Sequence, residues 1–370
     1  MSSQNPKAIP PPTTVKHSKR DTLLRWWAML SGYAVIASLV MHITLTDTSF
    51  HFHDPDSQVA FHKMVQGQVH RPFAYRIAAP FSIRVMSNMT PTSVKDRLSA
   101  FWNSKLSLAT YGYTGEYATE YTWGVLLLYL SLLVFGLLMY TLLGEFFPVP
   151  RLTRYLASIA CVAFVPIGRS FFVYDYPNLA VFTACILAMY KRNWSAFYPL
   201  FLVACLTKET SILLTIIYVL NIRNNIRSSK NIAHAACQLA IWILLFLLLR
   251  VGMAEEGGAL MEFHLLDYNL PLLLKPSSYF NFGPSLLPRG INILLICSAV
   301  VFTVSYWRYK PLFVRRSLSI LAFLLGLALF GGWIDELRMY YEAYPLIACA
   351  GFHTLLSLPW TPTQPAEQSN

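Results

Sequence analysis

The feature that most constrains this chain is a series of long apolar runs, several of which have the length of a membrane-spanning helix. A helix rises 1.5 Å per residue, so about 20 apolar residues cross the hydrocarbon of a bilayer. The chain has 370 residues, is 55% hydrophobic and has a mean hydropathy of +0.45. We therefore predict an all-α, polytopic transmembrane helical bundle of about nine or ten membrane segments. The runs cover 26–45, 121–144, 155–171, 177–190, 195–206, 210–221, 233–252, 290–307, 316–333 and 341–359.

Two polar tails flank one predicted transmembrane domain. Residues 1–24 are polar, rich in proline and basic, and we expect a disordered cytoplasmic tail before an uncleaved first span. The transmembrane domain covers 25–359, includes a long external loop over 46–120, and is followed by a disordered tail over 360–370. The six cysteines all fall inside apolar runs, which indicates neither a disulfide framework nor a metal site.

The runs 195–206 and 210–221 are each too short to span, and they form either one long helix or a broken hairpin that enters the membrane halfway. With the hairpin, one face carries more than half of the 29 Lys and Arg but few of the 18 acids. Such an excess is typical of a cytoplasmic face. We therefore favour the hairpin, a multi-pass plasma (inner) membrane protein with both termini cytoplasmic, and a site that faces the external side.

The stretch "HRPFAYRIAAP" in the first loop places Arg71 and Arg76 among apolar side chains. A guanidinium is a planar fork that suits a phosphate, so both arginines are candidate anion ligands. The alternative is that they anchor the chain to lipid headgroups. Apolar residues recur here at helical spacing and predict a helix that lies in the interface: Phe73, Ile77, Phe81 and Val85.

Just before this stretch, His51 and His53 lie close to Asp54 and Asp56, which raises the question of a metal site. The segment contains a proline and lacks helical ligand spacing, so we favour interfacial polar residues and assign no metal or other cofactor. Asp56 opens a helix-like run and can serve as an N-cap, a role that is compatible with that of a catalytic base.

Further charged residues are predicted on the same external side of the membrane. Each has a purely structural alternative: a helix cap for Asp175, a mutual ion pair for Lys208 and Glu209, and solvated ends of spans for the others. Their convergence from distant segments predicts a polar cavity at the interface. The sequence has no nucleotide-binding loop, dinucleotide fingerprint or serine-hydrolase elbow. The candidate substrate-binding residues here are Tyr174, Asp175, Lys208, Glu209, Asp335, Glu336 and Arg338.

A first-loop acid followed by "RPFAYRIAAP", "YDYP", "LTKETSILL" and "ELRMYYEAYPLI" resembles bacterial multi-spanning proteins related to the GT-C glycosyltransferases. The resemblance covers most of the membrane region. It implies transfer of a sugar from a polyprenyl-phosphate carrier to an acceptor at the external face, with Asp56, and Asp54 second, matching the catalytic base. The chain departs from that pattern in its "DPD" motif, where an adjacent acid pair is usual, and in lacking a recognisable soluble C-terminal domain.

The expected function is therefore that of a membrane glycosyltransferase in glycan biosynthesis for the cell envelope, acting on a glycan, lipid or protein acceptor. Its expected partners are a polyprenyl-phosphate-linked sugar donor, an acceptor that the sequence does not identify, and membrane lipids, with no nucleic acid. A carboxylate can deprotonate the acceptor hydroxyl, and arginine or lysine can stabilise the leaving phosphate. The alternatives are a glycan polymerase or ligase, an acyltransferase, or a transporter of a lipid-linked or anionic substrate.

Overall fold

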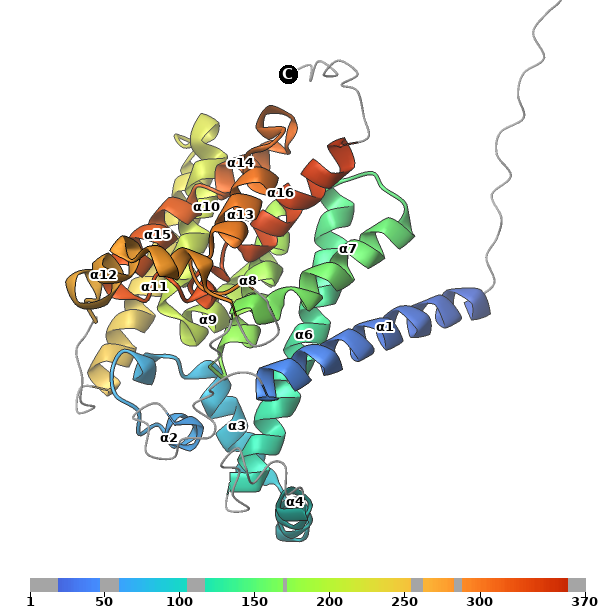
Figure 1. Cartoon of the computed structure of the whole chain (residues 1–370), viewed down its shortest axis with the longest axis vertical. Helices are drawn as coiled ribbons and strands as arrows, with labels where there is room; N and C mark the ends of the chain where they lie inside the picture. Colours follow the sequence, from blue (N-terminus) through green and yellow to red (C-terminus); the bar gives the residue numbers. More distant parts are fainter. Residues whose placement is uncertain are drawn as a thin grey trace, which may run out of the picture.

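The computed structural model describes residues 19–46, 60–104, 117–168, 172–253, 262–282 and 288–358. Throughout these residues the chain forms helices and turns, with one isolated bridge between Phe282 and Pro288 and no strand (Figure 1). The predicted all-helical fold is confirmed at this level. The α-helices are α1 (Lys19–Thr46), α2 (Phe61–Gln66), α3 (Ala78–Met89), α4 (Thr92–Ser104), α6 (Ala118–Phe146), α7 (Arg151–Ala163), α8 (Asp175–Tyr190), α9 (Trp194–Thr207), α10 (Ile212–Ile222), α11 (Ser229–Gly252), α12 (Leu270–Leu274), α13 (Ile293–Val304), α14 (Leu312–Ser317), α15 (Ile320–Gly331) and α16 (Tyr344–Ser357).

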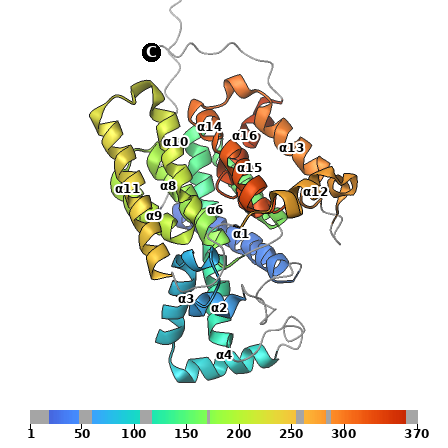
Figure 2. The ribbon, with the colours of Figure 1, turned by 90° about the vertical axis from the view of Figure 1, so that its left-hand side faces the viewer.

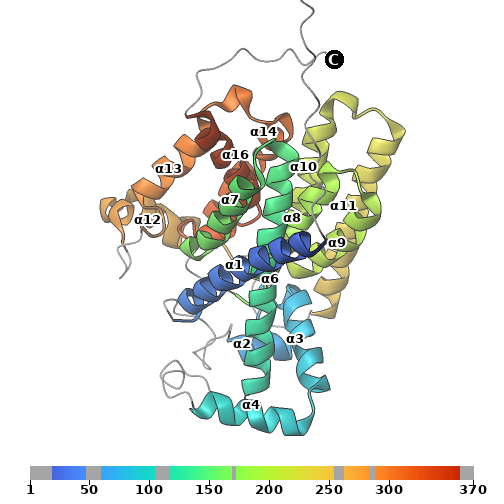
Figure 3. The ribbon, with the colours of Figure 1, turned by 90° about the vertical axis from the view of Figure 1, so that its right-hand side faces the viewer.

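The long helix α6 lies at the centre of the fold and contacts α1, α3, α4, α7 and α8. Figure 2 shows α8 to α11 on one side of α6 and α12 to α16 on the other, and α10 joins the two groups through contacts with α14 and α15. The helices α2, α3 and α4 gather at one end of the long axis. The turns between α10 and α11 and between α13 and α14 lie at the opposite end (Figure 3).

Four helical segments of the described chain are long and apolar enough to cross a membrane. They support the predicted membrane location, while the larger number of spans expected from the sequence stays a prediction. Four shorter apolar helices accompany them, at Trp194–Thr207, Leu265–Leu274, Ile293–Val304 and Tyr344–Ser357. The four long segments are Trp26–Leu45, Ala118–Phe146, Ser229–Gly252 and Leu312–Gly331.

Helix α11 exposes apolar side chains and buries a polar one, which is the reverse of a helix in a water-soluble protein. Large apolar side chains stand on its outside, and Leu248 and Val251 are 58% and 76% exposed. Its one fully buried residue is the polar Gln238, whose amide atoms have no hydrogen-bond partner. An exposed apolar surface of this extent needs an apolar surrounding, which lipid provides.

The structure departs from the predicted helix over Phe73 to Val85. The structure forms a separate 3-10 turn at Phe73–Tyr75 and begins α3 only at Ala78. Proline has no backbone N–H and is tolerated in the first turn of a helix, so Pro80 is compatible with a start near Ala78 and not with a much earlier one. The continuous helix was therefore wrong, although Phe81 and Val85 of α3 remain exposed.

The chain between α9 and α10 is broken at Lys208, whose backbone is extended with φ of −159° and ψ of 139°. A 3-10 turn at Glu209–Ser211 follows, and α10 begins directly after it. One continuous helix is therefore not formed.

Candidate functional site

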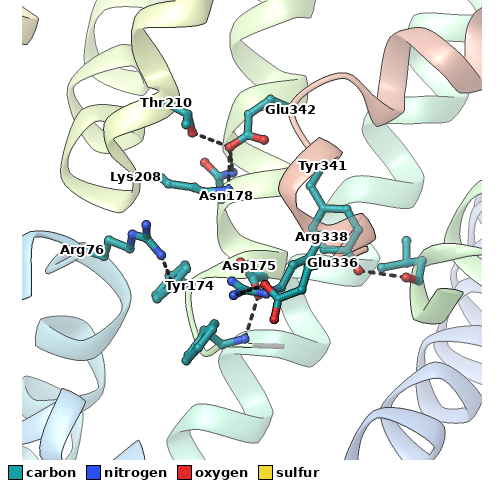
Figure 4. A network of polar contacts seen from close by, with 12 residues as sticks. Arg76, Tyr174, Asp175, Asn178, Lys208, Thr210, Glu336, Arg338, Tyr341 and Glu342 are labelled. Carbon is teal, nitrogen blue, oxygen red and sulfur yellow. Dashed lines mark hydrogen bonds and ion pairs between the residues drawn. The ribbon is translucent and has the colours of Figure 1, made fainter. Parts of the chain in front are cut away.

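Arg76 is a buried arginine that fastens the segment between α2 and α3 to the turn between α9 and α10. Its Nε and Nη2 donate to the two carboxylate oxygens of Glu209, at 3.1 and 2.5 Å. Its Nη1 donates to the hydroxyl of Tyr174, as Figure 4 shows. The guanidinium also lies over the rings of Tyr174 and Phe73, at 4.8 and 5.1 Å from their centroids. All three guanidinium nitrogens of Arg76 are therefore already bonded.

The arginine controls the ionisation of its partner. Burial alone would raise the pKa of Glu209, but the charge and hydrogen bonds of Arg76 outweigh burial and hold this pKa below its ordinary value. Glu209 is therefore an anion at neutral pH. Its backbone carbonyl also accepts a hydrogen bond from the indole of Trp242 at 2.9 Å, which fixes the turn against α11.

Lys208 and Glu209 do not pair with each other. The extended backbone at Lys208 sends neighbouring side chains to opposite sides, and Lys208 reaches Glu342 at 2.9 Å. Both side chains are almost inaccessible, at 2% and 0% exposed. The same oxygen of Glu342 accepts from Asn178 at 3.1 Å and from Thr210, whereas its other oxygen is buried without a partner.

Arg338 forms the third buried contact. It lies 2.6 Å from Glu336 and 3.8 Å from Asp175, and its guanidinium stacks 4.3 Å from the ring centroid of Phe172. One oxygen of Asp175 accepts the backbone N–H of Phe172 at 2.7 Å, so this acid shapes the entry into α8, and its second oxygen has no partner. Burial raises the pKa of Glu336, and Arg338 only partly opposes that rise.

Together these contacts form what we call the buried ion-pair network, which we define as Arg76, Lys208 and Arg338 with Asp175, Glu209, Glu336 and Glu342; among the paired carboxylates, Glu209 is the most exposed one, at 31%. Its members come from the segment between α2 and α3, the start of α8, the α9–α10 turn and the segment before α16. Figure 4 shows all of them except Glu209 close to one another. Each cation is matched by at least one carboxylate. Such an arrangement can hold fixed charges away from water, which is costly unless every charge is compensated.

Two of the predicted residues lie apart from this network. Asp335 accepts a hydrogen bond from the hydroxyl of Tyr268, at 3.1 Å to each carboxylate oxygen, on the side of α12. Arg71 makes no ion pair with any described residue, and its buried Nε has no hydrogen-bond partner. The two arginines of "HRPFAYRIAAP" therefore differ: Arg76 is fully bonded, whereas no described residue forms an ion pair with Arg71.

Asp54 and Asp56, together with His51 and His53, lie outside the described residues. Within the described parts of the chain, no group of three or more His, Cys, Asp or Glu side chains could hold a metal ion. The cysteines are all free, and four of the six are buried.

The sequence interpretation missed Glu342, which accepts three donors, and its neighbours Asn178 and Thr210. The available signal was the position of Glu342 among aromatic residues in "MYYEAYP", directly before an apolar run. A carboxylate in such a place needs a buried cationic partner. Lys208, in the similarly apolar "LTKETSILL", was the matching candidate.

Comparison with known proteins adds no relative: no family model, curated protein or solved structure matches this chain significantly. Function must be inferred from the geometry of the site.

Proposed function

We propose that this protein is an integral membrane glycosyltransferase of GT-C type, which transfers a sugar from a polyprenyl-phosphate carrier to an acceptor at the external membrane face. The observation that supports it is the convergence of Arg76, Lys208 and Arg338 with four carboxylates inside a helical fold with apolar outer surfaces. Buried ionisable groups in membrane proteins are costly and commonly mark a functional site.

Within this proposal the free guanidinium of Arg71 binds the phosphate of the donor. The leaving lipid phosphate gains negative charge as the bond to the sugar breaks, and a positioned cation stabilises it most where water is scarce. Arg71 suits this role because its Nε has no protein partner. Arg76 would have to give up Glu209 to do the same.

The buried network then acts as the support for Arg71. The clamp between Arg76 and Glu209 holds the loop five residues after Arg71, and Phe73 between them packs against Phe172 with ring centroids 5.1 Å apart. A binding site that is already held in place by its neighbours pays a smaller entropic cost on binding than a site that must first become ordered. The same proposal includes the predicted hairpin, in which α9 and α10 enter the membrane only halfway.

The first test measures sugar transfer with purified protein and a panel of polyprenyl-phosphate sugars. Transfer by the wild type should fall by roughly 10²–10⁴-fold in Asp56→Asn, the loss typical of removing a positioned base, while the protein stays folded. Asp54→Asn should cost less if Asp54 only orients its neighbour or the acceptor. Full loss in Asp54→Asn with normal transfer in Asp56→Asn would reverse the two roles.

A transporter is the second candidate function. It is favoured by the buried carboxylate oxygens of Asp175 and Glu342 that have no partner, since partly satisfied buried acids are typical of ion and proton paths. Counterflow of substrate in vesicles, with no sugar release from any donor of the panel, would replace the enzyme by this alternative.

Membrane orientation is tested separately by cysteine accessibility, in a background where the exposed Cys237 and Cys297 are replaced by alanine. Asp96→Cys on α4 and Arg227→Cys in the α10–α11 turn are both exposed positions. An impermeant thiol reagent added to whole cells should label Asp96→Cys and not Arg227→Cys. The reverse pattern would place the ion-pair network near the cytoplasmic face and refute the proposed orientation.

A further inference from the structure

A cavity of about 490 Å³ opens at the end of the molecule opposite α4, where the α8–α9 turn, the α10–α11 turn and α14 meet. It is separate from the buried ion-pair network and shares no residue with it. Ligand pockets in proteins commonly have volumes of about 300–1,000 Å³, so this one can hold a small ligand or a headgroup.

The charge of this cavity is one-sided. Arg192, Lys230 and Arg316 line it, and no carboxylate is among the described residues that do. None of the three forms an ion pair with a described acid, whereas Lys191, the neighbour of Arg192, pairs with Glu145 at 2.7 Å outside the cavity. Clustered cations without a counter-charge repel one another and attract an anion.

Arg316 is the best-positioned of these cations. Its Nη1 donates to the backbone carbonyl of Asn221 at 3.0 Å and its Nη2 donates to Oδ1 of Asn224 at 3.4 Å, which fixes the side chain against the end of α10. Its Nε is buried and has no partner. An arginine that is held in place with a donor to spare is preorganised for a phosphate oxygen.

The aromatic wall of the cavity supplies a further polar group. Trp194 stacks on His234 with ring centroids 4.2 Å apart, and Nδ1 of His234 is hydrogen-bonded to the hydroxyl of Tyr198 at 2.7 Å. Nε2 is therefore the imidazole nitrogen left for a ligand. Apolar side chains, among them Leu312 and Phe313, line the cavity beside these polar groups.

We propose that this cavity binds a phosphate group, carried either by an anionic lipid headgroup or by a small soluble phosphate ester. The proposal is independent of the glycosyltransferase function, because it uses other residues and another end of the fold. An excess of basic residues on one membrane face is also expected from orientation alone. The orientation of a protein in the membrane, however, requires neither a cavity nor a buried, unpartnered Nε on Arg316.

The test uses the full-length protein in detergent and in lipid nanodiscs, with short-chain phosphatidic acid, glycerol 3-phosphate and phosphatidylcholine as probes. Binding is read by native mass spectrometry and by titration. The double variant Arg192→Gln/Lys230→Gln removes two cavity charges, and Arg316→Gln removes the preorganised donor. The matched control is Arg223→Gln/Arg227→Gln. It removes two exposed charges between α10 and α11 that do not line the cavity.

We expect phosphatidic acid or glycerol 3-phosphate to bind far more tightly than phosphatidylcholine. Each charged hydrogen bond contributes about 1.5–3 kcal/mol, so the cavity variants should weaken binding by roughly tenfold or more and the control by less than about twofold. Binding of glycerol 3-phosphate on its own identifies a soluble ester, and retention of phosphatidic acid that glycerol 3-phosphate does not displace identifies a lipid headgroup. Equal losses in cavity and control variants, or no preference for the phosphate probes, would overturn the proposal.

Discussion

The buried ion-pair network and the basic cavity each contain three cationic side chains, but only the network pairs them with carboxylates. In the network, Lys208 is 2% exposed and lies 2.9 Å from Glu342. In the cavity, Lys230 is exposed and has no acidic partner among the described residues. The difference follows from desolvation: a buried charge must find its counter-charge within the protein, whereas a half-exposed one can leave that position to a ligand.

The same comparison separates stability from binding. Removing one member of the network leaves a buried charge uncompensated, so these residues should govern whether the protein folds. Removing a cation of the cavity relieves repulsion and leaves no buried acid behind, so these residues should govern what the protein binds.

The largest effect is expected at the pair of Lys208 and Glu342. Lys208→Met and Glu342→Leu should each lower the free energy of unfolding by about 3–5 kcal/mol, because each leaves its partner buried and unpaired. The double variant Lys208→Met/Glu342→Leu should recover most of that loss. Chemical unfolding of the purified variants in one detergent measures all three.

The matched control in the cavity is Lys230→Met, for which we expect a change within about 0.5 kcal/mol. A single Lys208→Met variant as stable as the wild type would show that the network is hydrated or mobile enough to tolerate a lone charge. The contrast between the two regions would then fail.

The next effect distinguishes Arg71 from Arg76 in the segment between α2 and α3. Arg76→Lys keeps the charge but loses the two-pronged contact with Glu209, and should lower the free energy of unfolding by about 1–3 kcal/mol. Arg71→Lys should leave stability within about 0.5 kcal/mol, since Arg71 has no ion pair among the described residues, and should instead weaken donor binding in the transfer assay. Equal destabilisation by both variants would return Arg71 to a structural role.

Much of this organisation could be predicted from the sequence. The length of the apolar runs predicted an all-helical fold, and the spread of charged motifs predicted that Arg76, Asp175 and Glu209 come from distant segments to one place. Both predictions depend on patterns along the chain, which burial and helix geometry translate directly into structure.

The pairing of charges could not be predicted in the same way. Lys208 and Glu209 are neighbours in the sequence, yet the extended backbone at Lys208 separates them and gives each a distant partner. A sequence also does not reveal a cavity, because Arg192 and Arg316 line the same cavity only when the α8–α9 turn, the α10–α11 turn and α14 meet. Pairing and enclosure depend on long-range packing, which single-sequence patterns do not encode.

A smaller effect should appear in the pH dependence of stability. The pKa of Glu209 is held below its ordinary value, so its contribution is fully present above about pH 4.3 and is lost as the pH falls through the lower folded-state pKa. The stability difference between wild type and Glu209→Gln should be constant from about pH 5 to 7 and shrink at lower pH. Unfolding followed across this range tests it.

Glu336 supplies the opposite sign for the same experiment. Its pKa is raised by burial, so its contribution is present below the ordinary glutamate pKa and is lost as the pH rises through the folded-state pKa. Glu336→Gln should therefore cost less at neutral pH than Glu209→Gln. A larger cost for Glu336→Gln at pH 7 would mean that its contact with Arg338 outweighs its burial.

The smallest effect is expected in the empty cavity, and its sign is the opposite of that in the network. Arg192→Gln/Lys230→Gln removes two of three neighbouring cations, so the ligand-free protein should become more stable by up to about 0.5 kcal/mol at low salt. The gain should vanish at about 1 M salt, where the Debye length is only about 3 Å. In the network, Lys208→Met should remain destabilising at both salt concentrations, because buried pairs are screened much less. Unfolding at the two ionic strengths measures both, and a loss of stability in the cavity variant that persists at high salt would mean that these cations are bonded within the fold and are not held for a ligand.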